Sequence, residues 1–284
     1  MESRMSVHVP TSLTEAIDLL VANPTARLLS GGTDTMVEVN FNRSKPESVI
    51  ALRRIAALRE YTVDSDRIVI GAGVPYAMME KGPLAAALPA LAAAARTVGS
   101  PQIRAAGTLG GNLGTCSPAG DGLPVLAALD ATINLRSPRG TRAVPFAEFM
   151  TGVKRNSRAV DEIIESVSIS PTSGFQDYAK VGVRNAMVIS VASVCFVHDT
   201  ASSSVRIALG AVGPTIIRAR EAEQWLQSQV DASQHLPSHD KLAAEFAQRV
   251  AAAARPIDDH RSTAAYRRHA IEVLARRLYL RSTK

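Results

Sequence analysis

Cysteine is scarce in this sequence, and its scarcity excludes several kinds of metal site. Only two cysteines occur among 284 residues, Cys116 and Cys195. A [2Fe–2S] cluster usually takes four thiolates, and no C-x2-C pair indicates a zinc site, so the chain cannot hold a cluster of its own. We interpret both cysteines as buried thiols in a reducing compartment rather than as a disulfide. Cys116 is interpreted as a small filling residue, with a redox role as the alternative.

Long apolar runs and aromatic clusters are also missing. No stretch of about 18 apolar residues predicts a membrane-spanning helix. The first residues, MESRMSVHVPTSL, lack the apolar core of an export signal, so we expect a cytoplasmic protein with no membrane contact. The net charge is +6, but the basic residues are scattered and no nucleic-acid-binding motif is present, so we expect no nucleic-acid partner. The C-terminal arginines Arg267, Arg268 and Arg276 are interpreted as a solvated helix face, with a ligand site as the alternative.

Hydrophobic periodicity divides the chain at a polar break, PTSG, at residues 171–174. We therefore expect domains at 1–172 and 174–284. Ser12 is expected to cap the first helix, with Glu15 as its capping-box partner. The expected strands are 26–29, 48–52, 67–71, 132–136, 142–144 and 162–169, then three antiparallel strands at 176–183, 188–197 and 205–212. The expected helices are 12–21, one that begins at residue 35, 84–98, 220–228, 241–254 and 263–280.

Glycine gathers in two short clusters, Gly31-Gly32 and Gly110-Gly111. The second lies in LGGNLGTCSPAGD (109–121), which we expect to be a flexible loop between two helical segments. Glycine permits a positive φ and lets backbone N–H groups approach an oxyanion closely. Each cluster alone is typical of a tight turn. Two clusters together favour one extended ligand gripped from two sides, such as the pyrophosphate of a dinucleotide, although neither matches G-x-G-x-x-G or a P-loop.

Four motifs carry a resemblance to a known family. They are LLSGGTD (28–34), RAAGTLGGN (104–112), SPAGD (117–121) and DDHRSTAAYRR (258–268). Together they resemble the FAD-binding medium subunit of the molybdenum hydroxylases, the xanthine dehydrogenase and carbon monoxide dehydrogenase family. The resemblance implies an α+β fold. It has an FAD-binding domain of the vanillyl-alcohol oxidase (PCMH) type with two α/β subdomains, followed by a smaller sheet-plus-helices domain.

The resemblance also implies site residues. Asp121 would bind FAD hydroxyl groups, with a helix cap near Pro124 as its other reading, and Lys180 would lie at the flavin end, with a surface lysine as its other reading. Val188 stands where the family often has aspartate. No catalytic side chain and no metal ligand are expected. The implied cofactor-binding residues are Leu28, Leu29, Ser30, Gly31, Gly32, Thr33, Asp34 and Thr35 in the first pyrophosphate loop, Thr108, Gly110, Gly111 and Asn112 in the second, and Asp121, Ile164 and Lys180.

The resemblance finally implies a function within a complex. FAD would be bound non-covalently and would receive electrons from [2Fe–2S] clusters on a small iron–sulfur subunit, while a large molybdopterin subunit hydroxylates the substrate. The electrons would then pass to NAD or another acceptor, in a dimer of heterotrimers. Two alternatives are a stand-alone FAD oxidoreductase of the same fold and a nucleotide-binding module without redox activity.

Overall fold

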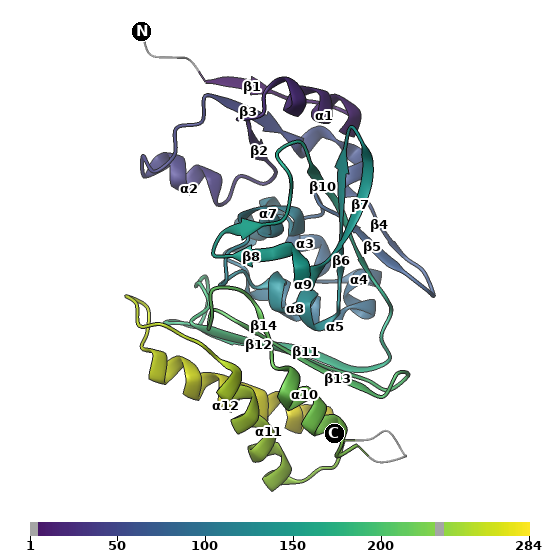
Figure 1. The fold of residues 1–284 in the computed structure, drawn as a ribbon, viewed down its shortest axis with the longest axis vertical. Helices are drawn as coiled ribbons and strands as arrows, with labels where there is room; N and C mark the ends of the chain where they lie inside the picture. Colours follow the sequence, from purple (N-terminus) through teal and green to yellow (C-terminus); the bar gives the residue numbers. More distant parts are fainter. Residues whose placement is uncertain (1–4, 231–235) are drawn as a thin grey trace.

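Three large β-sheets follow one another along the long axis of the molecule, with helices packed between and below them (Figure 1). The computed structural model describes residues 5–230 and 236–284. A three-stranded sheet lies at the N-terminal end, a five-stranded sheet in the middle and a four-stranded sheet toward the C-terminus. The expected α+β class follows from this arrangement.

The N-terminal sheet has the strand order β1-β3-β2, and both pairs are parallel. Ile17 and Leu20 of α1 are buried against it because they recur on one side of the helix. Ser12 Oγ accepts a bond from the Glu15 amide, as expected, but the Glu15 carboxylate accepts from the amide of Thr11 instead of Ser12. The elements are β1 (Ser6–His8), α1 (Leu13–Ala22), β2 (Arg27–Leu29), α2 (Thr35–Asn40), β3 (Ser48–Ala51), η1 (Leu52–Arg54) and η2 (Ala56–Arg59).

The middle sheet is antiparallel, with the order β4-β5-β10-β6-β7. Its strands share one hydrophobic core with the helices that follow β5. The strands are β4 (Tyr61–Val63), β5 (Ile68–Gly71), β6 (Thr132–Ser137), β7 (Gly140–Pro145) and β10 (Ile163–Ile169). The helices are α3 (Tyr76–Met79), α4 (Gly82–Ala87), α5 (Pro89–Thr97), α6 (Pro101–Ala106), α7 (Leu109–Thr115), α8 (Gly122–Ala128) and α9 (Phe146–Phe149), and β8 (Met150–Gly152) pairs with β9 (Arg155–Asn156).

Two sequence-based expectations fail in this region. The single helix expected at 84–98 is two helices, because Pro89 begins a new helix and forces Leu88 before it out of the helical conformation. The loop expected at 109–121 contains helix α7. Thr108 caps that helix, because its Oγ1 accepts a bond from the Gly111 amide at 3.0 Å. The cap and the packing of the helix outweigh the low helix propensity of its glycines.

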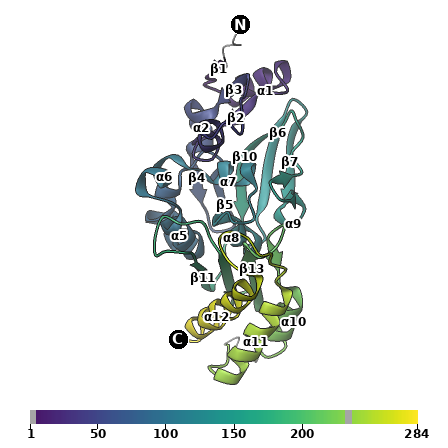
Figure 2. The ribbon, with the colours of Figure 1, turned by 90° about the vertical axis from the view of Figure 1, so that its left-hand side faces the viewer.

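The C-terminal sheet is antiparallel and has four strands, not the expected three, in the order β11-β12-β13-β14. Every residue of β12 is buried because both faces of the sheet are covered. Phe196 faces one core with the C-terminal helices, and Cys195 faces the core shared with α8. Figure 2 shows these helices at the end of the molecule opposite the N-terminus. The elements are β11 (Gly174–Val181), β12 (Ala192–Asp199), β13 (Ser204–Gly210), β14 (Ile217–Arg218), α10 (Arg220–Gln227), α11 (Asp240–Ala253) and α12 (Ala264–Ser282).

Arg267 was expected to lie on a solvated helix face, but the structure buries it, and it is only 3% exposed. Its guanidinium donates to the carbonyl oxygens of Val191 and Ala211 and to Asp259 Oδ1, at 2.7, 2.8 and 2.6 Å. Burial alone would raise the pKa of Asp259, but bonds from two backbone amides and from Arg267 outweigh it and lower that pKa to about 2. Arg267, whose side chain was predicted to be exposed to solvent, therefore connects α12 to the C-terminal sheet and its flanking loops.

The two halves of the chain meet at α8, whose residues are all buried. This helix packs against β12 and β13. The Ala211 amide donates to the Pro118 carbonyl oxygen, and Arg218 Nη1 donates to the Ala127 carbonyl oxygen, both at 2.8 Å. Polar groups at both ends of α8 therefore find partners in the C-terminal half.

Candidate functional site

The two glycine clusters of the sequence lie in contact. Ser30 Oγ and Thr108 Oγ1 are 2.8 Å apart, although the two residues are 78 positions apart in the chain. Gly31 packs so closely on the end of α6 that a Cβ there would lie 1.8 Å from the carbonyl oxygen of Ala106. Gly32 has φ +74°, a conformation that favours glycine. The first cluster therefore needs both glycines for its shape.

Four consecutive backbone amides in the first cluster have no acceptor. The N–H groups of Gly31, Gly32, Thr33 and Asp34 donate to no group within residues 5–230 and 236–284. In the second cluster, by contrast, the amides at the start of α7 bond to carbonyl oxygens of neighbouring segments and to the capping threonine. The first loop is thus the set of donors that can bind an anion, because successive free N–H groups form an anion-binding concavity.

The glycines of α7 divide into two roles. A Cβ at Gly110 would lie 2.6 Å from a carbonyl oxygen of the segment after β5, so Gly110 permits close packing of the backbone. At Gly111 the nearest atom to such a Cβ is Thr108 Oγ1 at 3.2 Å, and at Gly114 no atom lies within 4 Å. Gly111 lies inside the helix and does not adopt a positive φ. Gly111 and Gly114 leave the helix surface open toward a cavity.

That cavity has a volume of about 680 Å³, within the range of small-molecule sites. It collects every expected cofactor-binding residue except Leu29 and Lys180. Gly114 and Gly120 also line it and could have been found, since they belong to the same glycine-rich stretch. Lys154, in the turn of the β8–β9 hairpin, and Arg158, just after it, were missed because single basic residues in a loop form no recognisable pattern. The expected residues that line the cavity are Leu28, Ser30, Gly31, Gly32, Thr33, Asp34, Thr35, Thr108, Gly110, Gly111, Asn112, Asp121 and Ile164.

Asp121 is the polar centre of the cavity wall. Its Oδ1 accepts from the hydroxyls of Tyr178 and Ser190, at 2.9 and 2.6 Å, and its Oδ2 accepts from Lys180 Nζ at 2.7 Å. The side chains of Asp121 and Lys180 are each only 8% exposed. Asp121 makes no side-chain cap bond to α8, so the helix-cap reading fails. The surface-lysine reading of Lys180 fails as well.

Lys180 also fixes the loop between β11 and β12. Its ammonium group donates to the carbonyl oxygens of Thr97 and Val188, at 2.9 and 3.1 Å, in addition to Asp121. All three of its donors are therefore engaged. Val188, which we expected in a strand, lies in this loop, and the residues 187–189 line the cavity. Lys180 thus acts on the cavity through the residues that it holds.

The cavity is built to accept both charge and hydrogen bonds. Burial and the charges of Asp121 and Asp34 raise the pKa of Tyr76, which lines the cavity as a neutral phenol. A hydrogen bond from Lys154 lowers the pKa of Glu38, so that this carboxylate is ionised and paired. Asn112 Oδ1 is buried there with no partner in the described parts of the chain. An orphaned acceptor and a row of free amides fit a ligand that carries both hydroxyl and phosphate groups.

Comparison with known proteins assigns this architecture to a class. Residues 3–172 match the family model described as the FAD binding domain in molybdopterin dehydrogenase, and residues 177–282 match the CO dehydrogenase flavoprotein C-terminal domain. The chain therefore belongs to the family of FAD-binding subunits of molybdenum-hydroxylase-type dehydrogenases, which are oxidoreductases. The resemblance found in the sequence motifs, the fold that it implied and FAD as the cofactor are confirmed.

Relatives and solved structures match this chain over 64–99% of its length. The xanthine dehydrogenase FAD-binding subunit of Escherichia coli O157:H7 is 31% identical over 96% of this chain and 94% of its own length. The nicotinate dehydrogenase FAD-subunit of Eubacterium barkeri is 38% identical over 64% of each chain. Among solved structures, a carbon monoxide dehydrogenase chain from Hydrogenophaga pseudoflava superposes with a TM-score of 0.89 and 28% identity, over 99% of this chain and 97% of that one. No helix in the described part of this chain is long and apolar enough to cross a membrane.

Proposed function

We propose that this chain is the FAD-carrying electron-transfer subunit of a heteromeric molybdenum hydroxylase. The observation that carries the proposal is the row of free amides at Gly31–Asp34 on the wall of a cavity whose other wall is α7. Bound FAD would supply reversible two-electron chemistry at its isoalloxazine ring. The chain's own part is to hold that cofactor, shield it and fix its surroundings.

Each wall of the cavity has a proposed task. The amides of Gly31, Gly32, Thr33 and Asp34 bind the pyrophosphate, and Gly111 leaves room for it on the facing helix. Leu28, Leu29, Ser30 and Thr35 shape the first loop, while Thr108 and Gly110 shape the second. Asn112 offers its orphaned carbonyl oxygen to a cofactor hydroxyl. Ile164, 7% exposed beside a bulge in β10, supplies an apolar contact.

Asp121 and Lys180 have linked roles in this proposal. A carboxylate accepts about four hydrogen bonds, and Asp121 accepts three from the protein, so one acceptor site is left for an FAD hydroxyl. Lys180 has no free donor and does not line the cavity. We therefore assign Lys180 as a positioning residue that acts through Asp121 and Val188, in place of direct contact with the flavin.

The electrons must come from another subunit. The chain has two cysteines, both buried, and burial raises the pKa of each thiol, so it cannot provide four thiolates for a cluster. We propose a small iron–sulfur subunit as donor, a large molybdopterin subunit as the site of hydroxylation, and NAD or another molecule as acceptor. The assembly would be a dimer of heterotrimers in the cytoplasm.

The domain division at 1–172 and 174–284 is part of the same proposal. It is supported by a link with no helix or strand between the end of β10 at Ile169 and the start of β11 at Gly174.

Purification from the native host tests the function. The tagged chain should carry one FAD per chain, released into the supernatant by acid, and should co-elute with subunits that contain iron and molybdenum. Colour retained in the acid pellet would contradict non-covalent binding. A lone flavoprotein that oxidises its substrate at full rate would show that the stand-alone alternative is correct, and a chain that takes up no flavin after reconstitution would favour the non-redox module.

A further inference from the structure

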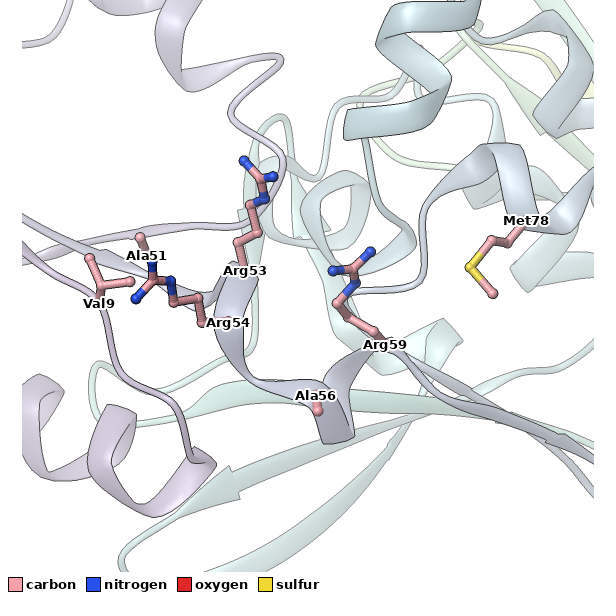
Figure 3. Close-up of a pocket in the computed structure, with 7 residues that line it drawn as sticks. All are labelled: Val9, Ala51, Arg53, Arg54, Ala56, Arg59 and Met78. Carbon is pink, nitrogen blue, oxygen red and sulfur yellow. The ribbon is translucent and has the colours of Figure 1, made fainter.

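A second cavity borders residues 51–59, a segment that also contributes to the wall of the FAD cavity. It has a volume of about 790 Å³ and is bordered by three arginines of η1 and η2 (Figure 3). Arg53 and Arg59 rise on the same side of the segment, while Arg54 reaches toward Val9 and Ala51. Met78 of α3 closes the opposite side. Its lining residues are Val9, Ala51, Arg53, Arg54, Ala56, Arg59 and Met78.

The three guanidinium groups have no counter-charge. None of Arg53, Arg54 and Arg59 forms a side-chain hydrogen bond or ion pair within the described ranges, and all three are exposed. No acidic residue is among the described residues that line this cavity. Other exposed arginines, such as Arg139 and Arg249, are each paired with a carboxylate. The cavity therefore concentrates unbalanced positive charge, which attracts an acidic group.

The apolar residues between the arginines indicate a protein partner in preference to a small anion. Val9 and Met78 are 44% and 41% exposed, and both border the cavity. Arginine and methionine are enriched in protein interfaces, whereas a small-molecule site buries most of its ligand. Here the arginines stay exposed around an open hollow.

The two cavities share their wall. Leu52 and Leu58 of this same segment line the FAD cavity, and Tyr76, two residues before Met78, lines it too. A partner that binds the arginines would therefore contact η1, η2 and α3, and neighbouring residues of the same elements line the FAD cavity. An electron donor docked there would lie beside a wall of the FAD cavity.

We infer that the cavity bordered by Arg53, Arg54 and Arg59 is the docking site for a carboxylate-bearing face of the electron-donating partner subunit. This inference rests on the proposed function. The guanidinium groups form charge-assisted bonds to the partner's carboxylates, and Val9 and Met78 pack against apolar atoms between them. Docking there presses on η1 and η2 and so fixes one wall of the FAD cavity.

The test is an R53E/R59E variant of the tagged chain, expressed from its native locus. The ratio of iron to FAD in the purified protein should fall at least about tenfold, because reversed charges repel an acidic partner. FAD per chain should stay at the wild-type level, which shows that the chain is folded. The matched control is R268E/R277E, which makes the same change in charge at two exposed α12 arginines that also lack an ion pair in the described structure.

The outcomes separate the possibilities. Loss of iron in R53E/R59E but not in R268E/R277E supports the docking site. An unchanged iron content in R53E/R59E, or an equal loss in both variants, overturns it. Calorimetry with inorganic pyrophosphate adds a second arm: stoichiometric binding that R53E/R59E abolishes, with iron retained, would show a small-anion site instead. A wild-type chain that brings down no iron would refute the proposed function itself, and this inference with it.

Discussion

Replacement of single glycines by alanine should separate the residues that bind FAD from those that only allow packing. Gly111 and Gly114 lie in α7 and face the cavity, and an added methyl group meets its nearest atom at 3.2 Å at Gly111 and none within 4 Å at Gly114. Gly31 also lines the cavity, but a methyl group there would lie 1.8 Å from a backbone oxygen. The same chemical change therefore has two different consequences.

The magnitudes follow from helix propensity and overpacking. Gly114→Ala should stabilise the chain by up to about 1 kcal/mol, since alanine is the better helix former. Gly111→Ala should gain less, because Thr108 Oγ1 must move by a few tenths of an ångström. Both should weaken FAD binding by about tenfold to a hundredfold, because a methyl group in a fitted site costs about 1–3 kcal/mol. Gly31→Ala should cost about 3 kcal/mol or more of folding stability.

Two measurements check this reasoning. Urea unfolding of the flavin-free protein gives the change in folding free energy, and titration of the same protein with FAD, followed by quenching of flavin fluorescence, gives the dissociation constant. If Gly111→Ala and Gly114→Ala bind FAD as the wild type does, α7 is not a wall of the cofactor site. If Gly31→Ala keeps wild-type stability, the close contact between the two glycine segments is wrong.

Three further results are expected. Lys180→Met should lower the unfolding free energy by about 3 kcal/mol, because it leaves the buried Asp121 carboxylate without its cation; additive effects with Asp121→Asn in urea unfolding would contradict that pairing. Cys116, with a pKa raised to about 11 by burial, and the equally buried Cys195 should not react with a thiol reagent at pH 8 until the chain is unfolded, and prompt reaction of native protein would refute their burial. The Asp259 carboxylate, with a folded pKa of about 2, should stabilise the fold above about pH 4 and lose that contribution as the pH falls toward 2. The difference in unfolding free energy between Asp259→Asn and wild type should therefore shrink over that range, and a constant difference would refute this expectation.

The sequence was sufficient to predict most of the longer helices and strands. Strands such as β5 and β10 are short β-branched runs with clear ends, and the two glycine clusters stand out by composition. Most of the expected site residues come together in one cavity because the motifs that identified them are the segments that form its walls.

The failures have a common physical cause, which is that long-range contacts decide local structure. Periodicity cannot show that Arg267 finds two carbonyl oxygens and Asp259 inside the fold, so it placed this charge in solvent. The glycines of α7 indicated a loop, and only the cap from Thr108 and the packed segment after β5 make it a helix. Lys180 could be placed on a strand but not paired, because Asp121 lies 59 positions away in the chain.

The burial of α8 bears on how the subunit is made. A ribosome that has released residues 1–172 has produced this apolar helix but not yet the strands β12 and β13 that cover it. Until they emerge, α8 has no place to bury its outer side, and Asp121 has neither Tyr178 nor Lys180. The N-terminal half must therefore wait for the C-terminal half during synthesis, and FAD can be loaded into its finished site only after translation has passed β13.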